Sequence, residues 1–306
     1  MRKGEKALIR VCNLVKYFDD FKVLNGLNIH VEKGSIYGLV GPNGAGKTTV
    51  MNHITGAYRQ NGGTIKIDGE DVYENEDIKK KVLYIADDWF YFGTATVKEM
   101  ASFYADIYKD FDKDRYLRIG KLFNIDEKRQ IRKLSKGMKK QVAFWIVLSC
   151  LPDVLILDEP LDGLDPVMRK QILNLIISDV SERGMTVLVS SHNLRELEDI
   201  CDHVGIIYRG KMVIEKSLDD LKGVVKKYQA IISDEDMTKI EENLDVLHKS
   251  KLGSVTTFII RDTKGNAEDF IKKLSPQFCE SVKLTLEEVF IYELGGMGYN
   301  VKDIII

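Results

Sequence analysis

The chain has 306 residues, of which 44% are hydrophobic, enough for about two globular domains at roughly 150 residues per domain. Its 45 Lys and Arg residues against 47 Asp and Glu give a net charge of −2. This excludes a protein that binds mainly by neutralising a nucleic-acid backbone, so we expect no nucleic-acid partner. Four cysteines without a CxxC pair favour a reduced, cytoplasmic interior over a zinc ribbon or a disulfide framework. No apolar stretch reaches the ~18 residues that span a bilayer, and the N-terminus shows no export signal.

Short apolar runs separated by turn signals predict several strands from Leu8 to Val40. The last of these strands, 35–40, leads directly into the glycine-rich segment 41–49, and a helix is expected from Val50 to Tyr58. Helical spacing between Thr96 and Ser149 predicts helices inserted between two strands of one sheet. Further along, a strand, a helix and a strand alternate as in βαβ units. The expected elements are Val154–Leu157, a helix through Asp179 and Met185–Ser190.

The sequence pattern changes after about residue 216. The expected strands are Tyr228–Ile232, Leu244–Lys249, Val255–Ile260 and Phe278–Leu284, and the expected helices are Asp234–Glu242, Ala267–Leu274 and Leu286–Leu294. The order β-α-β-β-α-β, with one extra helix, suits a small ferredoxin-like α+β unit. We therefore expect an α/β domain over 1–222 and an α+β accessory domain over 223–306, whose last six residues either add an edge strand or hang free.

Segment 41–49 matches the P-loop pattern G-x-x-x-x-G-K-T. Such glycines let backbone N–H groups surround phosphate oxygens at a helix N-terminus. Lys47 would hold the β- and γ-phosphates and Thr48 a magnesium ion, whereas the alternative is a glycine-rich turn with no ligand. The candidate phosphate-binding residues are Gly41, Pro42, Asn43, Gly44, Ala45, Gly46, Lys47, Thr48 and Thr49.

The apolar strand at 154–157 ends in two carboxylates, Asp158 and Glu159. Asp158 can bind magnesium, and Glu159 can polarise a water molecule that attacks the γ-phosphate. The alternative, a strand that merely ends in a solvated acidic turn, loses weight because a P-loop precedes it. The sequence therefore predicts hydrolysis of a nucleoside triphosphate with Mg²⁺.

From about Ile9 to Glu215 the sequence resembles the ATP-binding subunits of ATP-binding cassette (ABC) transporters. Five segments carry the resemblance, in chain order: 41–49, Leu134–Met138, Leu155–Pro160, Gly163–Pro166 and Ser190–His192. The second segment, Leu-Ser-x-Gly, discriminates this family from other P-loop ATPases. The resemblance implies a P-loop NTPase fold with a RecA-like core, an antiparallel β-subdomain and a helical subdomain. It also implies that two such domains pair head to tail on ATP and drive a separate membrane permease.

The resemblance assigns roles beyond the P-loop. Ser135 and Gly137 would contact the γ-phosphate held by the partner domain, and Asp165 is expected at the nucleotide. His192 looks like the switch histidine, which would join Glu159 and Lys47 in catalysis by sensing the γ-phosphate. For the adenine ring the family places an aromatic residue before the first hairpin. Alignment gives Phe18, with Tyr17 adjacent, unless these rings pack inside the β-subdomain instead.

Three positions depart from the family pattern. Asp87 stands where the family usually has Gln; its carboxylate could reach magnesium or a magnesium-bound water, but it cannot donate a hydrogen bond. In the signature segment, Lys136 and Met138 replace the commoner Gly and Gln, and Lys136 either adds positive charge near the γ-phosphate or lies in solvent. This pattern is similar to that of ABC-2 type bacterial exporters, including those of antimicrobial-peptide and bacitracin resistance.

Four consecutive aromatic residues follow Asp88. In the family this region receives a short helix of the membrane subunit, and exposed rings suit an amphipathic helix. Either Trp89 and Tyr91 or else Phe90 and Phe92 would anchor that partner, while the alternate rings would be buried.

We therefore expect an ATP-hydrolysing ABC subunit of an exporter. Its partners would be a second ABC ATPase subunit, either a second copy or a related chain, and an integral membrane permease. Its place would be cytoplasmic, at the inner face of the cell membrane. The competing interpretations are a soluble ABC ATPase, disfavoured because no long heptad insertion or second cassette is present, and a regulatory module that senses ATP without hydrolysing it.

Overall fold

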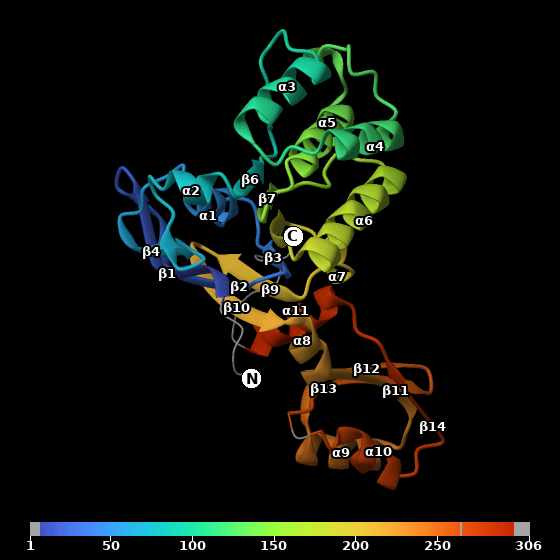
Figure 1. Ribbon diagram of the computed structural model, residues 1–306. Coiled ribbons are helices and arrows are strands. Elements are labelled where there is room, and N and C mark those ends of the chain that lie inside the picture. Colours follow the sequence, from blue (N-terminus) through green and yellow to red (C-terminus); the bar gives the residue numbers. More distant parts are fainter. Residues whose placement is uncertain (1–6, 264, 297–306) are drawn as a thin grey trace. The chain divides into compact units, whose positions relative to one another are not determined.

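The computed structural model describes residues 7–263 and 265–296, which form two compact units (Figure 1). The first unit contains the chain up to His192 together with Ile200–Glu215, and the second contains the remainder. The expectations for the N-terminal six residues and for the last six concern positions outside the described residues. Among the described residues, no helix is both long and apolar enough to cross a membrane.

The division between the units differs from the expected boundary after residue 222. That position lies inside helix α8 (Leu218–Val224), whereas the second unit already begins at Lys216. Helix α8 begins before residue 222 because the hydroxyl of Ser217 accepts a 3.1 Å hydrogen bond from the N–H of Asp220 and caps the helix. The second unit also includes Asn193–Asp199, which the sequence analysis assigns to the first domain.

Two sheets form the framework of the first unit. The larger sheet contains, in spatial order, β10 (Lys211–Ser217), β9 (His203–Tyr208), β3 (Ile36–Val40), β8 (Thr186–Ser191), β7 (Val154–Asp158) and β6 (Val82–Ile85). From β9 to β6, each strand is parallel to the next one in this order. The smaller, antiparallel sheet contains β2 (Phe21–Glu32), β1 (Ala7–Phe18), β4 (Gly62–Ile67) and β5 (Glu70–Asp71). Because parallel strands end at one edge of a sheet, the segments after β3, β7 and β8 lie close together.

The helices cover these sheets and build a helical subdomain. They are α1 (Lys47–Ile54), α2 (Glu76–Lys79), α3 (Val97–Ile107), α4 (Lys113–Phe123), the 3₁₀ turn Ile131–Lys133, α5 (Lys136–Ser149) and α6 (Pro166–Arg183). Helices α3 to α5 lie between β6 and β7 in the chain, as predicted (Figure 1). Trp145 of α5 stacks on Tyr116 of α4 with ring centroids 4.7 Å apart and donates its indole N–H to the Tyr116 carbonyl. This buried contact fixes α5 relative to α4.

The second unit contains a four-stranded antiparallel sheet. Its elements are β11 (Val225–Ile231), α9 (Asp234–Asn243), β12 (Asp245–Leu252), β13 (Val255–Arg261), α10 (Ala267–Lys273) and β14 (Phe278–Val282), with α7 (Leu194–Glu198), α8 and α11 (Leu286–Gly296). The strand order is β12-β13-β11-β14, the arrangement of a ferredoxin-like unit. Met237 and Ile240 of α9 and Ile271 of α10 pack against Tyr228 and Phe258 in its core.

Candidate functional site

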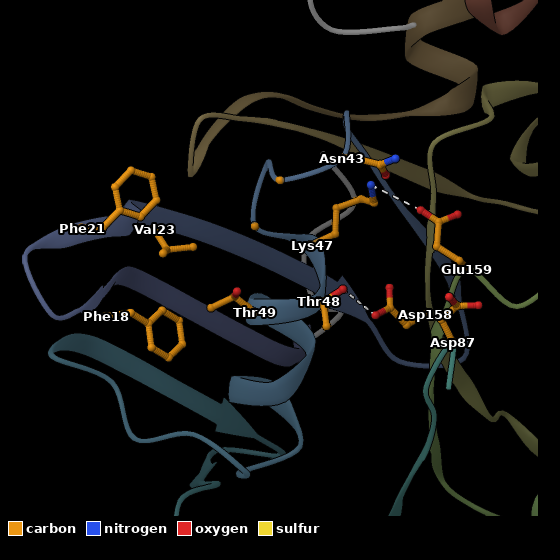
Figure 2. A pocket seen from close by; sticks show the side chains of 12 residues that line it. Phe18, Phe21, Val23, Asn43, Lys47, Thr48, Thr49, Asp87, Asp158 and Glu159 are labelled. Atoms are coloured by element: carbon orange, nitrogen blue, oxygen red, sulfur yellow. Dashed lines mark hydrogen bonds and ion pairs between the residues drawn. The ribbon is translucent and has the colours of Figure 1, made fainter. Parts of the chain in front are cut away.

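The segment between β3 and α1 forms a turn around the N-terminus of α1 (Figure 2). Gly46 precedes the helix with φ 110°, a conformation that side chains rarely adopt, and no side chain caps the helix. A Cβ at Gly41 would lie 2.3 Å from the carbonyl oxygen of Ile207 in β9. The two glycines are therefore required by the backbone. The uncapped N–H groups of α1 suit phosphate oxygens.

Lys47 begins α1 and is only 6% exposed. Its ammonium donates a 2.7 Å hydrogen bond to the carbonyl of Gly41 and a longer one, 3.4 Å, to that of Pro42. It also lies 3.3 Å from Oε1 of Glu159, an ion pair that lacks hydrogen-bond geometry (Figure 2). The predicted phosphate-binding lysine and the predicted catalytic carboxylate are therefore direct neighbours.

Thr48 and Asp158 form the second contact across this edge of the sheet. The Thr48 hydroxyl donates a 2.6 Å hydrogen bond to Oδ2 of Asp158, and the Ser190 hydroxyl donates one of 2.5 Å to Oδ1. Tyr84 donates a longer bond to Oδ2, and burial, then the charge of Asp158, raises the pKa of its phenol. Asp158 is 3% exposed, so these donors satisfy a buried carboxylate. A hydroxyl and a carboxylate are the oxygen ligands that Mg²⁺ prefers, and the pair fits this ion.

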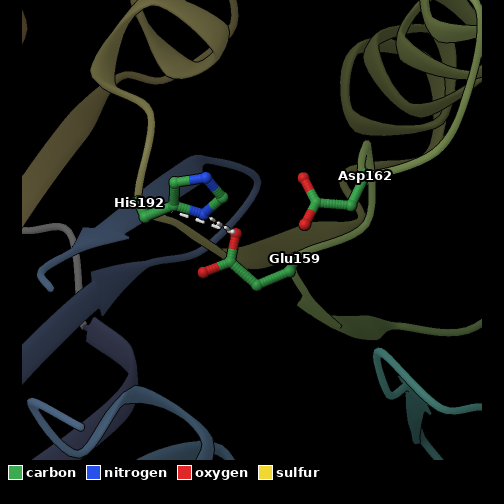
Figure 3. Close-up of side chains that lie close together, drawn as sticks. All are labelled: Glu159, Asp162 and His192. Atoms are coloured by element: carbon green, nitrogen blue, oxygen red, sulfur yellow. Dashed lines mark hydrogen bonds and ion pairs between the residues drawn. The ribbon is translucent and has the colours of Figure 1, made fainter. Parts of the chain in front are cut away.

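Glu159 follows β7 and contacts His192, the residue after β8 (Figure 3). Nδ1 of His192 lies 2.9 Å from Oε2 of Glu159, and the backbone N–H of His192 donates a 3.3 Å bond to the same oxygen. Asp162 joins them, since ligand atoms of all three side chains lie within 4.8 Å of one another. The structure therefore brings together the two residues that the sequence analysis pairs in catalysis, and adds a carboxylate that the sequence analysis does not assign.

A cavity of about 470 Å³ extends from the P-loop to the β1–β2 hairpin, within the usual size range of small-molecule sites. Phe18, Phe21 and Val23 line the end remote from Glu159 (Figure 2). Tyr17 does not line the cavity; its ring lies under the ammonium of Lys22. Of the two rings proposed for adenine, the structure thus places Phe18 at the cavity.

Phe21 is a cavity residue that the sequence analysis misses. It is 72% exposed and pairs directly with Phe18 across the hairpin. The signal was present in the sequence, since the turn at Asp19 and Asp20 places residues 18 and 21 opposite each other.

Comparisons with known proteins agree with this geometry. Residues 24–162 match the family described as ABC transporter. The chain is 31% identical over 290 residues to the ABC transporter ATP-binding protein YtrB of Bacillus subtilis, covering 94% of this chain and 99% of that protein. It is 33% identical over 304 residues to the bacitracin transport ATP-binding protein BcrA of Bacillus licheniformis, covering 95% and 98%.

The chain belongs to the ATP-binding subunits of ABC transporters. A solved ATP-binding subunit of an ABC transporter superposes with a TM-score of 0.66 at 27% identity, covering 71% of this chain and 92% of that one. The dimeric ATP-binding cassette MJ0796, bound to ADP and phosphate, shares the fold with a TM-score of 0.62 at 20% identity. The chain is thus an ATP-binding and ATP-hydrolysing subunit, and the interpretation as a transporter subunit is favoured over the competing ones.

The signature segment of this ABC subunit lies outside the cavity. Ser135 caps α5 by accepting a 3.2 Å hydrogen bond from the N–H of Met138, and its side chain is exposed. A Cβ at Gly137 would lie 2.7 Å from the carbonyl oxygen of Gly163, so the two segments pack backbone to backbone. Asp165 caps α6 with two 3.0 Å hydrogen bonds and is also absent from the cavity lining.

Asp87 lines the same cavity as Asp158, but its carboxylate has partners in the helical subdomain. Oδ1 lies 3.1 Å from the ammonium of Lys140 and 3.5 Å from that of Lys136. Partial burial alone would raise the pKa of Asp87, but the two lysines outweigh it and hold that pKa below its ordinary value. The sequence analysis leaves open whether Lys136 lies near the γ-phosphate or in solvent. In the structure, Lys136 pairs with Asp87.

The four aromatic residues after Asp88 are divided between core and surface. Trp89 is 8% exposed, with its ring beside Tyr104, whereas Phe90 and Phe92 are 68% and 45% exposed. Phe92 contacts Phe90 and Phe103 edge to face, with centroids 5.5 and 5.0 Å apart. The exposed aromatic patch of this subunit therefore consists of Phe90, Phe92 and Phe103.

Proposed function

We propose that this ABC subunit pairs head to tail with a second cassette on two Mg-ATP molecules, and that closing and reopening of the pair drives a membrane permease. The observation that supports pairing is the separation of two sets of residues. Lys47 and Glu159 line one cavity, and His192 contacts Glu159. Ser135 and Gly137 instead lie at an exposed helix start outside this cavity. A helix N-terminus binds phosphate, so the second set suits a nucleotide held by the other cassette.

Within one site, each residue has a distinct task. Thr48 and Asp158 would hold Mg²⁺, which supplies positive charge to the phosphates, and phosphate oxygens would replace Glu159 as the partner of Lys47. Glu159 would accept the proton of the attacking water, as a general base must, from a position within reach of His192. The rings of Phe18 and Phe21, two residues that face each other across the hairpin, would flank the adenine base.

The permease is expected to dock on the patch of Phe90, Phe92 and Phe103. Exposed aromatic rings that touch one another offer the apolar surface that an amphipathic helix needs. Such docking would place the subunit at the cytoplasmic face of the membrane. Likeness over nearly the whole chain to a bacitracin transport protein supports an exporter.

The first experiment measures the molar mass of the Glu159→Gln variant by light scattering, with and without Mg-ATP, across a concentration series. This variant should bind ATP, lose most turnover and double its mass when Mg-ATP is added. The matched control, Glu159→Gln with Ser135→Arg, should bind ATP but stay monomeric. A Glu159→Gln variant that hydrolyses ATP at a near-normal rate would remove Glu159 from the role of base. ATP-bound protein that never pairs would contradict self-pairing.

A further inference from the structure

Lys140 is a buried lysine near the start of helix α5. Its side chain is 3% exposed, whereas that of Lys136, one turn earlier, is 63% exposed. Burying an ammonium costs several kcal/mol unless partners compensate its charge and its hydrogen bonds. The buried ammonium of Lys140 therefore needs specific partners. These partners belong to two segments of the ATPase site.

The first partner is the backbone of Glu159. The Lys140 ammonium donates a hydrogen bond to the Glu159 carbonyl oxygen, which also accepts a long bond, 3.5 Å, from the N–H of Asp162. The second partner is Asp87, whose Oδ1 lies 3.1 Å from the same ammonium. The lysine thus joins the segment after β6, the segment after β7 and helix α5.

Glu159 needs such support because of its backbone. Its φ is 45°, in the left-handed region that costs a non-glycine residue about 1 kcal/mol or more. Side chains hold both polar groups of its backbone, since its N–H donates a 3.0 Å bond to the Ser190 hydroxyl and its carbonyl accepts from Lys140. This backbone conformation sets the direction in which the Glu159 carboxylate points, toward Lys47 and His192.

We propose that Lys140 is a positioning residue for hydrolysis: its buried ammonium fixes the backbone of Glu159 and thereby aims the catalytic carboxylate. Asp87, whose Oδ1 lies 3.1 Å from this ammonium, compensates its charge and helps to hold it in place, which gives a physical role to the Asp that stands where the family usually has Gln. The inference rests on the proposed role of Glu159 as the base. It differs from that proposal because Lys140 acts through the Glu159 main chain and touches no reacting atom.

The test compares steady-state ATP hydrolysis by full-length Lys140→Met, Lys140→Arg and Lys139→Met variants. Lys140→Met keeps the length of the side chain and removes its charge and hydrogen bond, so kcat should fall about tenfold to a hundredfold, the order expected when a catalytic group shifts by about 1 Å. The KM for ATP should stay within about twofold, because Lys140 does not line the cavity. Lys140→Arg should recover much of kcat.

Lys139→Met is the matched control. Lys139 is the next residue on the same helix, and its ammonium lies over the ring of Tyr91 rather than against Glu159 or Asp87. The kcat of Lys139→Met should stay within about twofold of that of the unmodified chain. If Lys140→Met does not fold, Lys140→Gln, which is shorter and neutral, is measured in its place with the same expectations.

The proposal would be overturned if the kcat of Lys140→Met stayed close to that of the unmodified chain. A rise in KM by the same factor as the fall in kcat would overturn it as well. The Glu159→Gln variant measured in parallel separates the two claims. If Glu159→Gln is inactive while Lys140→Met is fully active, only the positioning role fails. If both are fully active, the proposed base fails as well.

Discussion

The hydroxyl of Thr48 donates a 2.6 Å hydrogen bond to the carboxylate of Asp158, which lies 110 residues further along the chain. The bond joins the first helix of the cassette to the end of a central strand. It brings a neutral and an anionic oxygen ligand together inside the cavity, with Asp158 held on its other side by Ser190. Two residues proposed for magnesium are therefore already in contact.

Replacing Thr48 with Val should separate magnesium-dependent from magnesium-independent steps. The change removes the hydroxyl and keeps the shape, so Mg-ATP hydrolysis should fall by about a hundredfold, the order seen when one stabilising group is lost. Affinity for ATP in EDTA should change little, because the P-loop backbone and Lys47 remain. Steady-state ATP hydrolysis checks the first expectation, and fluorescence titration of a labelled nucleotide with and without Mg²⁺ checks the second. Thr48→Ser is the active control. Equal loss under both conditions would speak against a magnesium role.

The hairpin rings should contribute to nucleotide affinity. Each of Phe18→Ala and Phe21→Ala should weaken ATP binding by about 1–3 kcal/mol, the usual size of a stacking contact with a base. Tyr17→Ala is the control, since this ring lies at the same hairpin but outside the cavity. Calorimetric titration with ATP and with triphosphate alone would locate the effect. Unchanged ATP affinity in both Phe variants would reject the stacking assignment.

Gly137→Ala should destabilise the subunit even though alanine favours helices. The new methyl group would lie 2.7 Å from the carbonyl oxygen of Gly163, so one of the two backbone segments would have to shift. Overpacking of this kind costs about 1–3 kcal/mol, which exceeds the ~1 kcal/mol gained in helix propensity. Chemical denaturation checks this against Gly93→Ala, where an added methyl group meets no atom within 4 Å. A stability equal to that of the control would show that the two segments are free to separate.

Asp87 should contribute stability that depends on pH. Its pKa is lowered in the folded chain, so its contribution is fully present above the ordinary carboxyl pKa and is lost as the pH falls through the lowered one. Stability of the unmodified chain should therefore drop more steeply than that of Asp87→Asn below about pH 4. Urea denaturation from neutral to acidic pH measures the two slopes. Asp88→Asn is the control, because the Asp88 carboxylate forms no ion pair within the described residues. Parallel slopes for all three chains would contradict the lysine pairing.

Local patterns in the sequence predict the elements and the chemistry of this chain, but not its long-range partners. The P-loop, the paired carboxylates and His192 can be read from motifs because each follows a strand of the same parallel sheet. The pairing of Asp87 with Lys140 involves residues 53 positions apart and has no periodic signal. Similarly, alternation along the aromatic run leaves two choices, and only packing against Tyr104 shows that Trp89 is the buried ring.

The position of α7 in the second unit affects how any shortened form of this protein would behave. Leu286 donates its backbone N–H to Glu198, and Arg195 pairs with Glu287, so the first helix after His192 takes two of its contacts from α11. Removing residues from 216 onward would strip these contacts from a helix that lies, along the chain, between two segments of the first unit. A weaker ATPase in the truncated protein would then report the loss of contacts to α7, the helix that directly follows His192 in the chain.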